Sequence, residues 1–184
     1  RWLADWTAVT HEVDDLYSRL SVATTVDTTD EAAEAALNEF LDTIFEPYQL
    51  VQNQLQKKLL ASGFSAPDLE TPLAKMKADD EAFCEANLEL QTDEQKLGID
   101  YDKIIGAQTV VWEGEEITLS RLSRVQVSED RGRREAAWRA EMTRKLEDRA
   151  SLNTLWAKFL ANRVEQAQRA GFGGNFTALT WKRL

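Results

Sequence analysis

The pentapeptide His11-Glu12-Val13-Asp14-Asp15 has residue types that could form a zinc-binding helix. In the motif His-Glu-x-x-His, two histidines four positions apart bind the metal and the glutamate acts as a base. Asp15 stands where the second histidine is required. His11 and Asp15 could share a metal from one helix face, but that face is opposite the apolar stripe of the segment. We expect both side chains to be solvated, and we assign no catalytic, cofactor-binding or metal-binding residue.

Acidic residues gather between positions 79 and 94, where a pair beside a cleft could act as general acid and base. Their spacing singles out no pair, and carboxylates on helix surfaces are usually hydrated. The single cysteine, Cys84, follows Phe83 and is predicted to be a small core residue, because a reactive thiolate needs a nearby cation or helix N-terminus. One cysteine also excludes an internal disulfide, which favours a reducing compartment such as the cytoplasm.

Arginines recur through residues 131–149, a pattern that could indicate nucleic-acid binding. Acidic residues interleave with them at helical spacings, as in Arg131/Glu135 and Arg144/Asp148, and such pairs can neutralise each other within one helix. Phosphate binding depends on uncompensated positive charge. We therefore expect no nucleic-acid partner.

The composition is that of an ordinary globular domain: 184 residues, 43% hydrophobic, with 22 basic and 32 acidic side chains for a net charge of −10. Residues 1–118 carry 8 basic and 25 acidic side chains, whereas residues 119–184 carry 14 and 7, so the two parts are expected to face each other or solvent. With one histidine, the chain cannot form a site that needs two histidine ligands. No segment resembles a signal peptide or a membrane span, so we expect no membrane partner.

Apolar residues at three- and four-residue steps predict amphipathic helices over most of the chain. The first helix has the stripe Trp2, Leu3, Trp6, Val9, Val13, Leu16, Tyr17 and Leu20. The second, capped by Thr29 or Asp30, has the stripe Ala33, Leu37, Phe40, Leu41, Ile44, Phe45, Tyr48, Val51, Leu55 and Leu59. Pro47 predicts either a kink in this helix or the start of another, and Gly63 its end. A third helix is expected over 73–90 and another over 93–105.

The period then changes to that of β-structure. Two short runs on either side of Glu113-Gly114 predict a β-hairpin over residues 109–119, packed through Val110, Trp112, Ile117 and Leu119. A short helix near 119–125 follows. From a cap at Ser128, a long helix or a collinear pair is predicted over 129–170, with the stripe Trp138, Met142, Leu146, Leu152, Leu155, Trp156, Phe159, Leu160, Val164 and Ala167. The fold class is therefore mostly α: one antiparallel helical domain with a single hairpin.

From Glu85 onward, a succession of segments matches a known family. The segments are Glu-Ala-Asn-Leu-Glu-Leu at 85–90, Asp-Tyr-Asp-Lys-Ile-Ile-Gly-Ala-Gln-Thr-Val at 100–110, the hairpin at 112–119, Ser-Glu-Asp-Arg at 128–131, Arg-Glu-Ala-Ala-Trp-Arg at 134–139, Asp-Arg-Ala-Ser-Leu-Asn at 148–153, Arg163, Ala167 and Ala-Gly-Phe at 170–172. In this order they resemble the N-terminal region of the oligoendopeptidase F and thimet oligopeptidase family of zinc metallopeptidases. Residues 1–84 match the family's helical N-terminal region in pattern.

The resemblance implies a cytosolic enzyme that hydrolyses short peptides in a channel between two helical lobes. The family's zinc ligands and its catalytic His, Glu and Tyr residues lie downstream of the matching region, so none is carried onto a residue here. The resemblance thus implies that this chain is a fragment, residues 1–184 of an N-terminal domain, that forms one wall of the channel and does not bind zinc. The expected partners are peptide substrates in the complete enzyme and the missing catalytic lobe.

The chain begins at Arg1 and ends at Leu184 without a visible stop to its final helix, which agrees with the expectation of a fragment. Apolar residues that meet the missing lobe should then be exposed, and the fragment should self-associate. The tryptophans are the leading candidates: Trp2, Trp6, Trp112, Trp138, Trp156 and, above all, Trp181. The alternative is a stand-alone helical module for protein interaction without catalytic activity.

Overall fold

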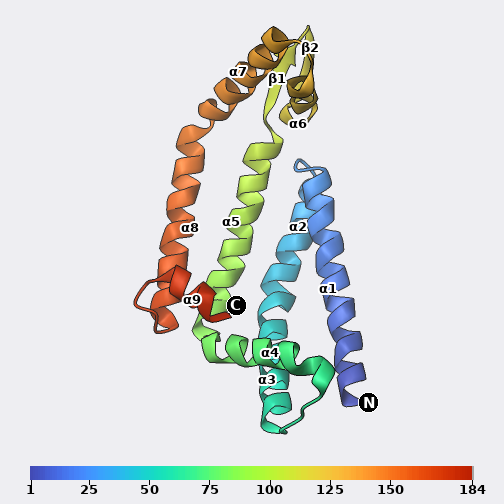
Figure 1. Cartoon of the computed structure of the whole chain (residues 1–184), viewed down its shortest axis with the longest axis vertical. Helices are drawn as coiled ribbons and strands as arrows, with labels where there is room; N and C mark the ends of the chain where they lie inside the picture. The colour runs from blue at the N-terminus through green and yellow to red at the C-terminus, as the bar shows by residue number, and fades with distance from the viewer. Residues whose placement is uncertain (184) are drawn as a thin grey trace.

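A computed structural model describes residues 1–183, and it is mostly helical as the sequence predicts. The helices are α1 (Trp2–Val26), α2 (Glu31–Phe40), α3 (Glu46–Ala61), α4 (Glu70–Ala82), α5 (Leu88–Gly106), α6 (Leu119–Leu122), α7 (Arg131–Glu147), α8 (Arg149–Arg169) and α9 (Phe176–Arg183). The molecule is elongated, with α1, α2, α5 and α8 running along its length (Figure 1). The hairpin, α6 and α7 lie at one end, and α4 crosses the other end.

The helix that begins at Glu31 continues through Pro47 to Ala61. Proline cannot donate a backbone hydrogen bond, and its ring clashes with the carbonyl four residues earlier. A π-helical turn, Leu41–Phe45, lies directly before Pro47 and accommodates the interruption in the hydrogen-bond ladder. Of the two arrangements that Pro47 allows, the structure has the single continuous helix.

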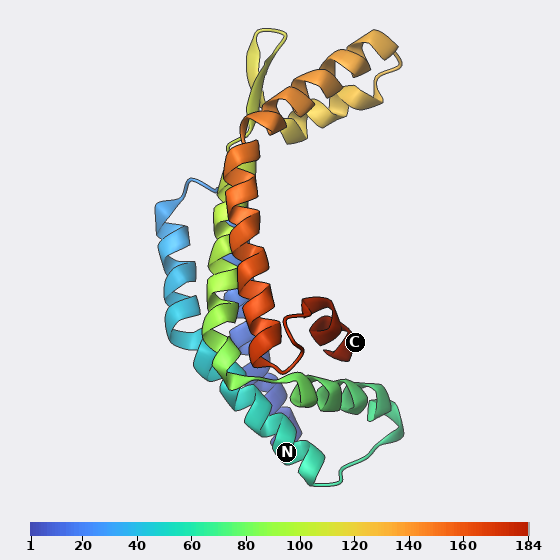
Figure 2. The ribbon, with the colours of Figure 1, turned by 90° about the vertical axis from the view of Figure 1, so that its left-hand side faces the viewer.

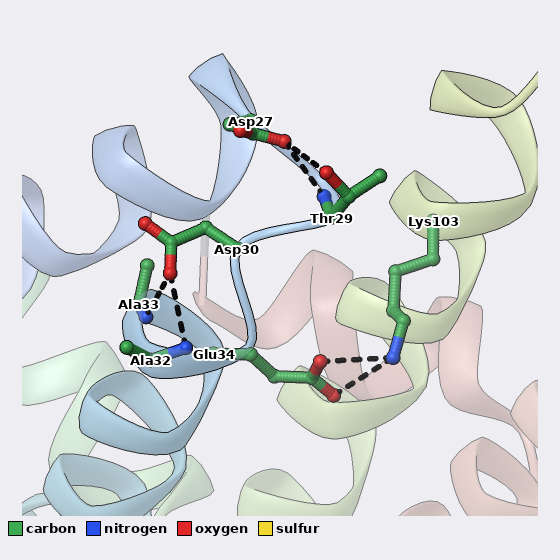
Figure 3. Close-up of polar contacts among 7 residues, drawn as sticks. All are labelled: Asp27, Thr29, Asp30, Ala32, Ala33, Glu34 and Lys103. Carbon is green, nitrogen blue, oxygen red and sulfur yellow. Dashed lines mark hydrogen bonds and ion pairs between the residues drawn. The ribbon is translucent and has the colours of Figure 1, made fainter.

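The turn between α1 and α2 is held by local polar contacts (Figure 3). Asp30 caps α2, since its Oδ1 accepts hydrogen bonds of 3.0 Å from the backbone amides of Ala32 and Ala33. One turn into α2, Glu34 forms a 2.8 Å ion pair with Lys103 of α5. The predicted cap at Asp30 is confirmed, and the ion pair ties this turn to the neighbouring helix.

The main apolar cluster joins α1, α2 and α5. Leu37, Phe40 and Leu41 are buried, and partly buried residues pack against them: Val13, Tyr17, Leu20, Phe45 and Ile99. Trp2, Val9 and Leu16 of the predicted first stripe are exposed instead. Ile44 and Val51 of the second stripe are also exposed.

The single helix predicted over residues 73–90 is wrong. Helix α4 ends at Ala82, the backbone is extended at Phe83 and Cys84, and α5 begins at Leu88. No proline or glycine marks this break. Its cause is tertiary: Asn87 is buried, and its Nδ2 donates a 2.8 Å hydrogen bond to the backbone carbonyl of Gln166 in α8. The break lets α4 cross the bundle while α5 runs along it (Figure 2).

The hairpin forms as predicted, from β1 (Thr109–Trp112) and β2 (Glu115–Thr118), with Val110 opposite Ile117. Both turn residues have positive φ, 52° at Glu113 and 88° at Gly114, as a type I′ turn requires. Ile117 is buried in a cluster with Leu122 and Ala137, and the other three predicted packing residues lie against it: Val110, Trp112 and Leu119. Two strands are marginal alone, and here α6 and α7 supply the apolar surface that they need.

Residues 131–169 form two helices that meet at Asp148, so a pair of helices is confirmed, but the prediction that the pair is collinear is wrong. Asp130, rather than the predicted Ser128, caps α7, because its side chain accepts hydrogen bonds from the amides of Gly132 and Arg133. Helix α7 packs against the hairpin, α6 and the 3-10 turn Ser123–Val127, whereas α8 packs against α5. The two helix axes therefore diverge at Asp148 (Figure 2).

Candidate functional site

A polar seam joins α5 and α8. Glu94 of α5 accepts hydrogen bonds of 2.7 Å from Nε of Arg163 and from Nε2 of Gln166. Asn162 donates to the carbonyl of Leu90 at 2.9 Å, and Gln166 is only 2% exposed. Because buried polar groups are costly unless paired, this α5–α8 seam, formed by Glu94, Asn162, Arg163 and Gln166, fixes the rotation of α8 about its own axis.

The seam leaves an apolar stripe of α8 exposed. Trp156, Leu160 and Val164 follow one another at four-residue steps, and they are 54%, 47% and 51% exposed. We call these three residues the α8 face. Exposed apolar side chains that line one helix face are typical of a surface that another element or protein covers. The predicted stripe of this helix is therefore wrong in part, because polar side chains occupy much of the interface with α5.

The tryptophans divide into two groups. Trp181 of α9 is 70% exposed, and Trp2, Trp138 and Trp156 are also exposed. Trp6 is half-buried and donates a 2.8 Å hydrogen bond to Gln52, whereas Trp112 packs in the hairpin cluster. Exposure is thus confirmed for four of the six tryptophans, Trp181 most of all, and is wrong for Trp6 and Trp112.

His11 and Asp15 do not form a site together. Both are exposed on α1, and Asp15 forms a 2.7 Å ion pair with Arg19. No group of three or more histidine, cysteine, aspartate or glutamate side chains within residues 1–183 is arranged to hold a metal ion. The described residues therefore do not by themselves fit a zinc ion, whose ligands the family resemblance places downstream of this chain.

Several acidic residues of α4 and α5 pair with basic side chains. Asp79 contacts Lys75 at 3.5 Å, and Glu81 forms an ion pair with Lys182 that lowers the pKa of its carboxyl group, chiefly through the hydrogen bond. Glu94 belongs to the α5–α8 seam. Cys84 is half-buried, with its Sγ 3.6 Å from the carbonyl oxygen of Arg169. These positions support structural roles for the acidic residues and for the thiol.

Carboxylates also neutralise much of the arginine-rich segment. Arg144 forms the predicted ion pair with Asp148 at 2.7 Å, but Glu135 pairs with Arg139 at 2.8 Å and not with Arg131. Arg133 reaches across to Glu113 in the hairpin turn. The paired basic side chains of α7 thus act mainly within their own helix, and Arg133 links the helix to the hairpin. No helix within the described residues is long and apolar enough to cross a membrane.

The sequence pattern did not predict the polar contacts of the α5–α8 seam. Asn162 and Gln166 are four residues apart in a helix and so share one face, but their polar side chains give no apolar signal. Asn87 contributes to the same interface from just before α5. Only a search for buried amide side chains at helical spacing could have found this set.

Comparison with solved structures identifies similar folds. One is a protein from Bacillus anthracis str. Ames described as an oligoendopeptidase F, with a TM-score of 0.76 and 23% identity. A second oligoendopeptidase F structure has a TM-score of 0.78 and 26% sequence identity. The structure described as PZ peptidase A with inhibitor 2 has a TM-score of 0.77 and 26% sequence identity. No family model matches the sequence, and comparison with curated proteins gives no match.

Each match covers 89% of this chain but only 29–30% of the solved chain. The likeness therefore includes most of the present fold and a minor part of each larger protein. The resemblance to oligoendopeptidase F that the sequence indicates is thereby confirmed in three dimensions, for a fold equivalent to about three tenths of those chains.

Proposed function

We propose that this chain is the N-terminal, channel-wall region of a cytoplasmic, zinc-dependent oligopeptidase that hydrolyses short peptides. The observation that supports the proposal is the structural match to two chains at 26% identity, one an oligoendopeptidase F and the other a PZ peptidase A. In this proposal the zinc ligands lie outside the chain. Zinc bound by those ligands would act as a Lewis acid that polarises the scissile carbonyl and activates a water for peptide hydrolysis.

The role of the present residues is structural. The α5–α8 seam holds two long helices in one orientation, and the hairpin end extends the bundle beyond α5 (Figure 1). A wall that restricts the length of a substrate needs this kind of fixed geometry. The α8 face, which polar residues do not cover, is the surface that we assign to contact with the catalytic lobe.

The decisive experiment is to read the coding sequence beyond Leu184 and to express the longer protein. A downstream His-Glu-x-x-His, stoichiometric zinc and hydrolysis of short fluorogenic peptides would support the proposal. A stop codon soon after Leu184 would instead favour the stand-alone interaction module, an alternative for which the exposed α8 face is the specific observation.

We predict that residues 1–184 alone neither bind zinc at a structured site nor hydrolyse peptides. One histidine and one cysteine cannot supply a usual zinc ligand set. Elemental analysis of the purified chain checks the first statement and a peptide-cleavage assay the second. Stoichiometric zinc that is lost in His11→Ala would contradict the prediction.

A further inference from the structure

An open cavity of about 590 Å³ lies between the N-terminal half of α1, helix α3, the chain that follows it and the start of α4. Most of its wall is apolar. Representative wall residues are Trp6, Leu59, Phe64, Leu73 and Met76. A cavity of this volume and lining is in the range that takes a small organic molecule.

The cavity exists because α1 is incompletely packed along this stretch. No residue of α1 is fully buried. Near the cavity, Gln52 joins α3 to α1 through two polar contacts: its Oε1 accepts from Trp6 Nε1 at 2.8 Å, and its Nε2 donates to Thr10 Oγ1 at 2.9 Å. These hydrogen bonds hold the wall in place without filling the space between the helices.

One carboxylate lies at the polar part of the lining. Asp14 Oδ1 accepts a 3.1 Å hydrogen bond from the hydroxyl of Tyr48, and no basic side chain within residues 1–183 forms an ion pair with it. His11 lines the cavity beside it. The adjacent Asp15 is outside the cavity and is already paired with Arg19. Asp14 is exposed, and a carboxylate without an ion-pair partner next to an apolar wall favours a ligand that combines a hydrocarbon group with a positive charge.

The acidic character of this part of the chain also favours a positively charged ligand. Residues 1–118, which include every element of the cavity wall, carry 25 acidic and 8 basic side chains. An acidic excess over the segment that contains the wall favours cations over anions near it. The apolar wall buries the hydrocarbon part of the ligand, and the acidic excess favours a positive charge on it.

We propose that this cavity is a binding site for a small apolar cation, with an aromatic or branched aliphatic group against Leu73 and Met76 and an ammonium group beside Asp14. Such chemistry is found in free amines and at the amino terminus of a peptide that begins with a hydrophobic residue. The site is separate from the α8 face and does not depend on the proposed peptidase function.

The probe is 2-phenylethylamine, titrated into the full 184-residue chain and followed by amide chemical shifts in ¹H–¹⁵N spectra. We expect saturable shifts confined to residues of the cavity wall. Asp14→Asn should weaken binding about 10-fold, because it removes a charge-assisted contact. Leu73→Trp, which fills the cavity, should abolish binding. The matched control is Asp15→Asn, which removes a carboxylate at the next position and should leave the affinity unchanged.

Further ligands identify the chemistry. Neutral 2-phenylethanol should bind more weakly and be insensitive to Asp14→Asn, and 3-phenylpropionate should not bind. A peptide beginning with free phenylalanine that binds as tightly as the amine, while its acetylated form does not, would show that the site accepts peptide termini. Failure of both peptides with binding of the amine would restrict the site to free amines. Absence of saturable shifts with the amine, or equal effects of Asp14→Asn and Asp15→Asn in folded protein, would overturn the proposal.

Discussion

Asp148 is the residue at which the hairpin end joins the long bundle. Its Oδ2 accepts a 2.9 Å hydrogen bond from Nε2 of Gln108, which is buried just before β1, and a 2.7 Å bond from Arg144. The hydrogen bond from Gln108 is the main reason that the pKa of this carboxyl group lies below its ordinary value of 3.8, and Arg144 lowers it further. One side chain thus links the end of α5 to the junction of α7 and α8.

The lowered pKa of Asp148 predicts a pH dependence of stability. In the unfolded chain the carboxyl group titrates near 3.8, so its native contacts contribute stability fully above that pH and lose it as the pH falls through the lower native pKa. The free energy of unfolding of wild type should therefore approach that of Asp148→Asn as the pH falls from about 5 to about 2, the range in which such carboxylates titrate. Urea unfolding at a series of pH values measures it.

The control for Asp148→Asn is Asp15→Asn, which removes a surface carboxylate far from the bend. Its difference from wild type reports what the loss of any exposed ion pair does over the same titration. If the difference in unfolding free energy between wild type and Asp148→Asn stays constant down to about pH 2, which is about two units below the usual pKa of a carboxyl group, the assigned contacts are contradicted.

Gly114 is predicted to be the most sensitive position of the hairpin turn. Its φ is +88°, a conformation that a β-branched residue adopts only with strain. We expect Gly114→Val to lower the free energy of unfolding by about 1–3 kcal/mol. Gly98→Ala in α5 is the control, because no atom lies within 4 Å of the added methyl group and alanine favours a helix. Equal thermal stability of the two variants would count against the turn.

At the scale of elements, the α5–α8 seam decides how the two longest neighbouring helices of the bundle meet. We expect Glu94→Ala to destabilise the fold by about 1–3 kcal/mol, since it removes the acceptor of Arg163 and one of the two acceptors of the buried Gln166, whose Nε2 also donates to Asn162. Chemical denaturation followed by circular dichroism checks this. Glu165→Ala is the control: that glutamate is exposed and pairs only with Arg169, so the change should cost less than about 0.5 kcal/mol. Similar losses in both variants would show that the seam has no special role.

At the scale of the whole molecule, the exposed apolar side chains predict association. Trp156 on the α8 face and Trp181 on α9 are both more than half exposed, at 54% and 70%. Despite the net charge of −10, we expect the apparent mass from light scattering to rise with concentration. Trp156→Ser and Trp181→Ser should each reduce the rise. Val127→Ser, at an exposed valine in the 3-10 turn before α7, is the control and should not.

A strictly monomeric chain at high concentration, with no dye-detectable apolar surface, would disagree with this expectation. Loss of association in Val127→Ser alone would place the contact at the hairpin end and not on α8 or α9.

The sequence by itself determined the local features. The two β-rich runs on either side of Glu113-Gly114 predict the hairpin, because strand and turn preferences act over a few residues. Its register, with Val110 opposite Ile117, comes from the structure. The cap at Asp30 and the helix ends at Gly63 and Gly171 follow from equally local rules, and both glycines have positive φ. The ordered segments after Glu85 also indicated the family resemblance that the solved structures support.

Tertiary structure alone decided which helix faces are covered. The break between α4 and α5 has no local signal, since it depends on Asn87 reaching α8 in space. Apolar periodicity places Leu160 and Val164 on the stripe of this helix, but the pairing of Glu94 with Arg163 and Gln166 forms the interface with α5 and leaves both residues, with Trp156, exposed. The cavity beside Asp14 likewise depends on how α1, α3 and α4 are placed around it. Periodicity records how apolar a face is, whereas the neighbour that covers it is set by contacts between residues far apart in the chain.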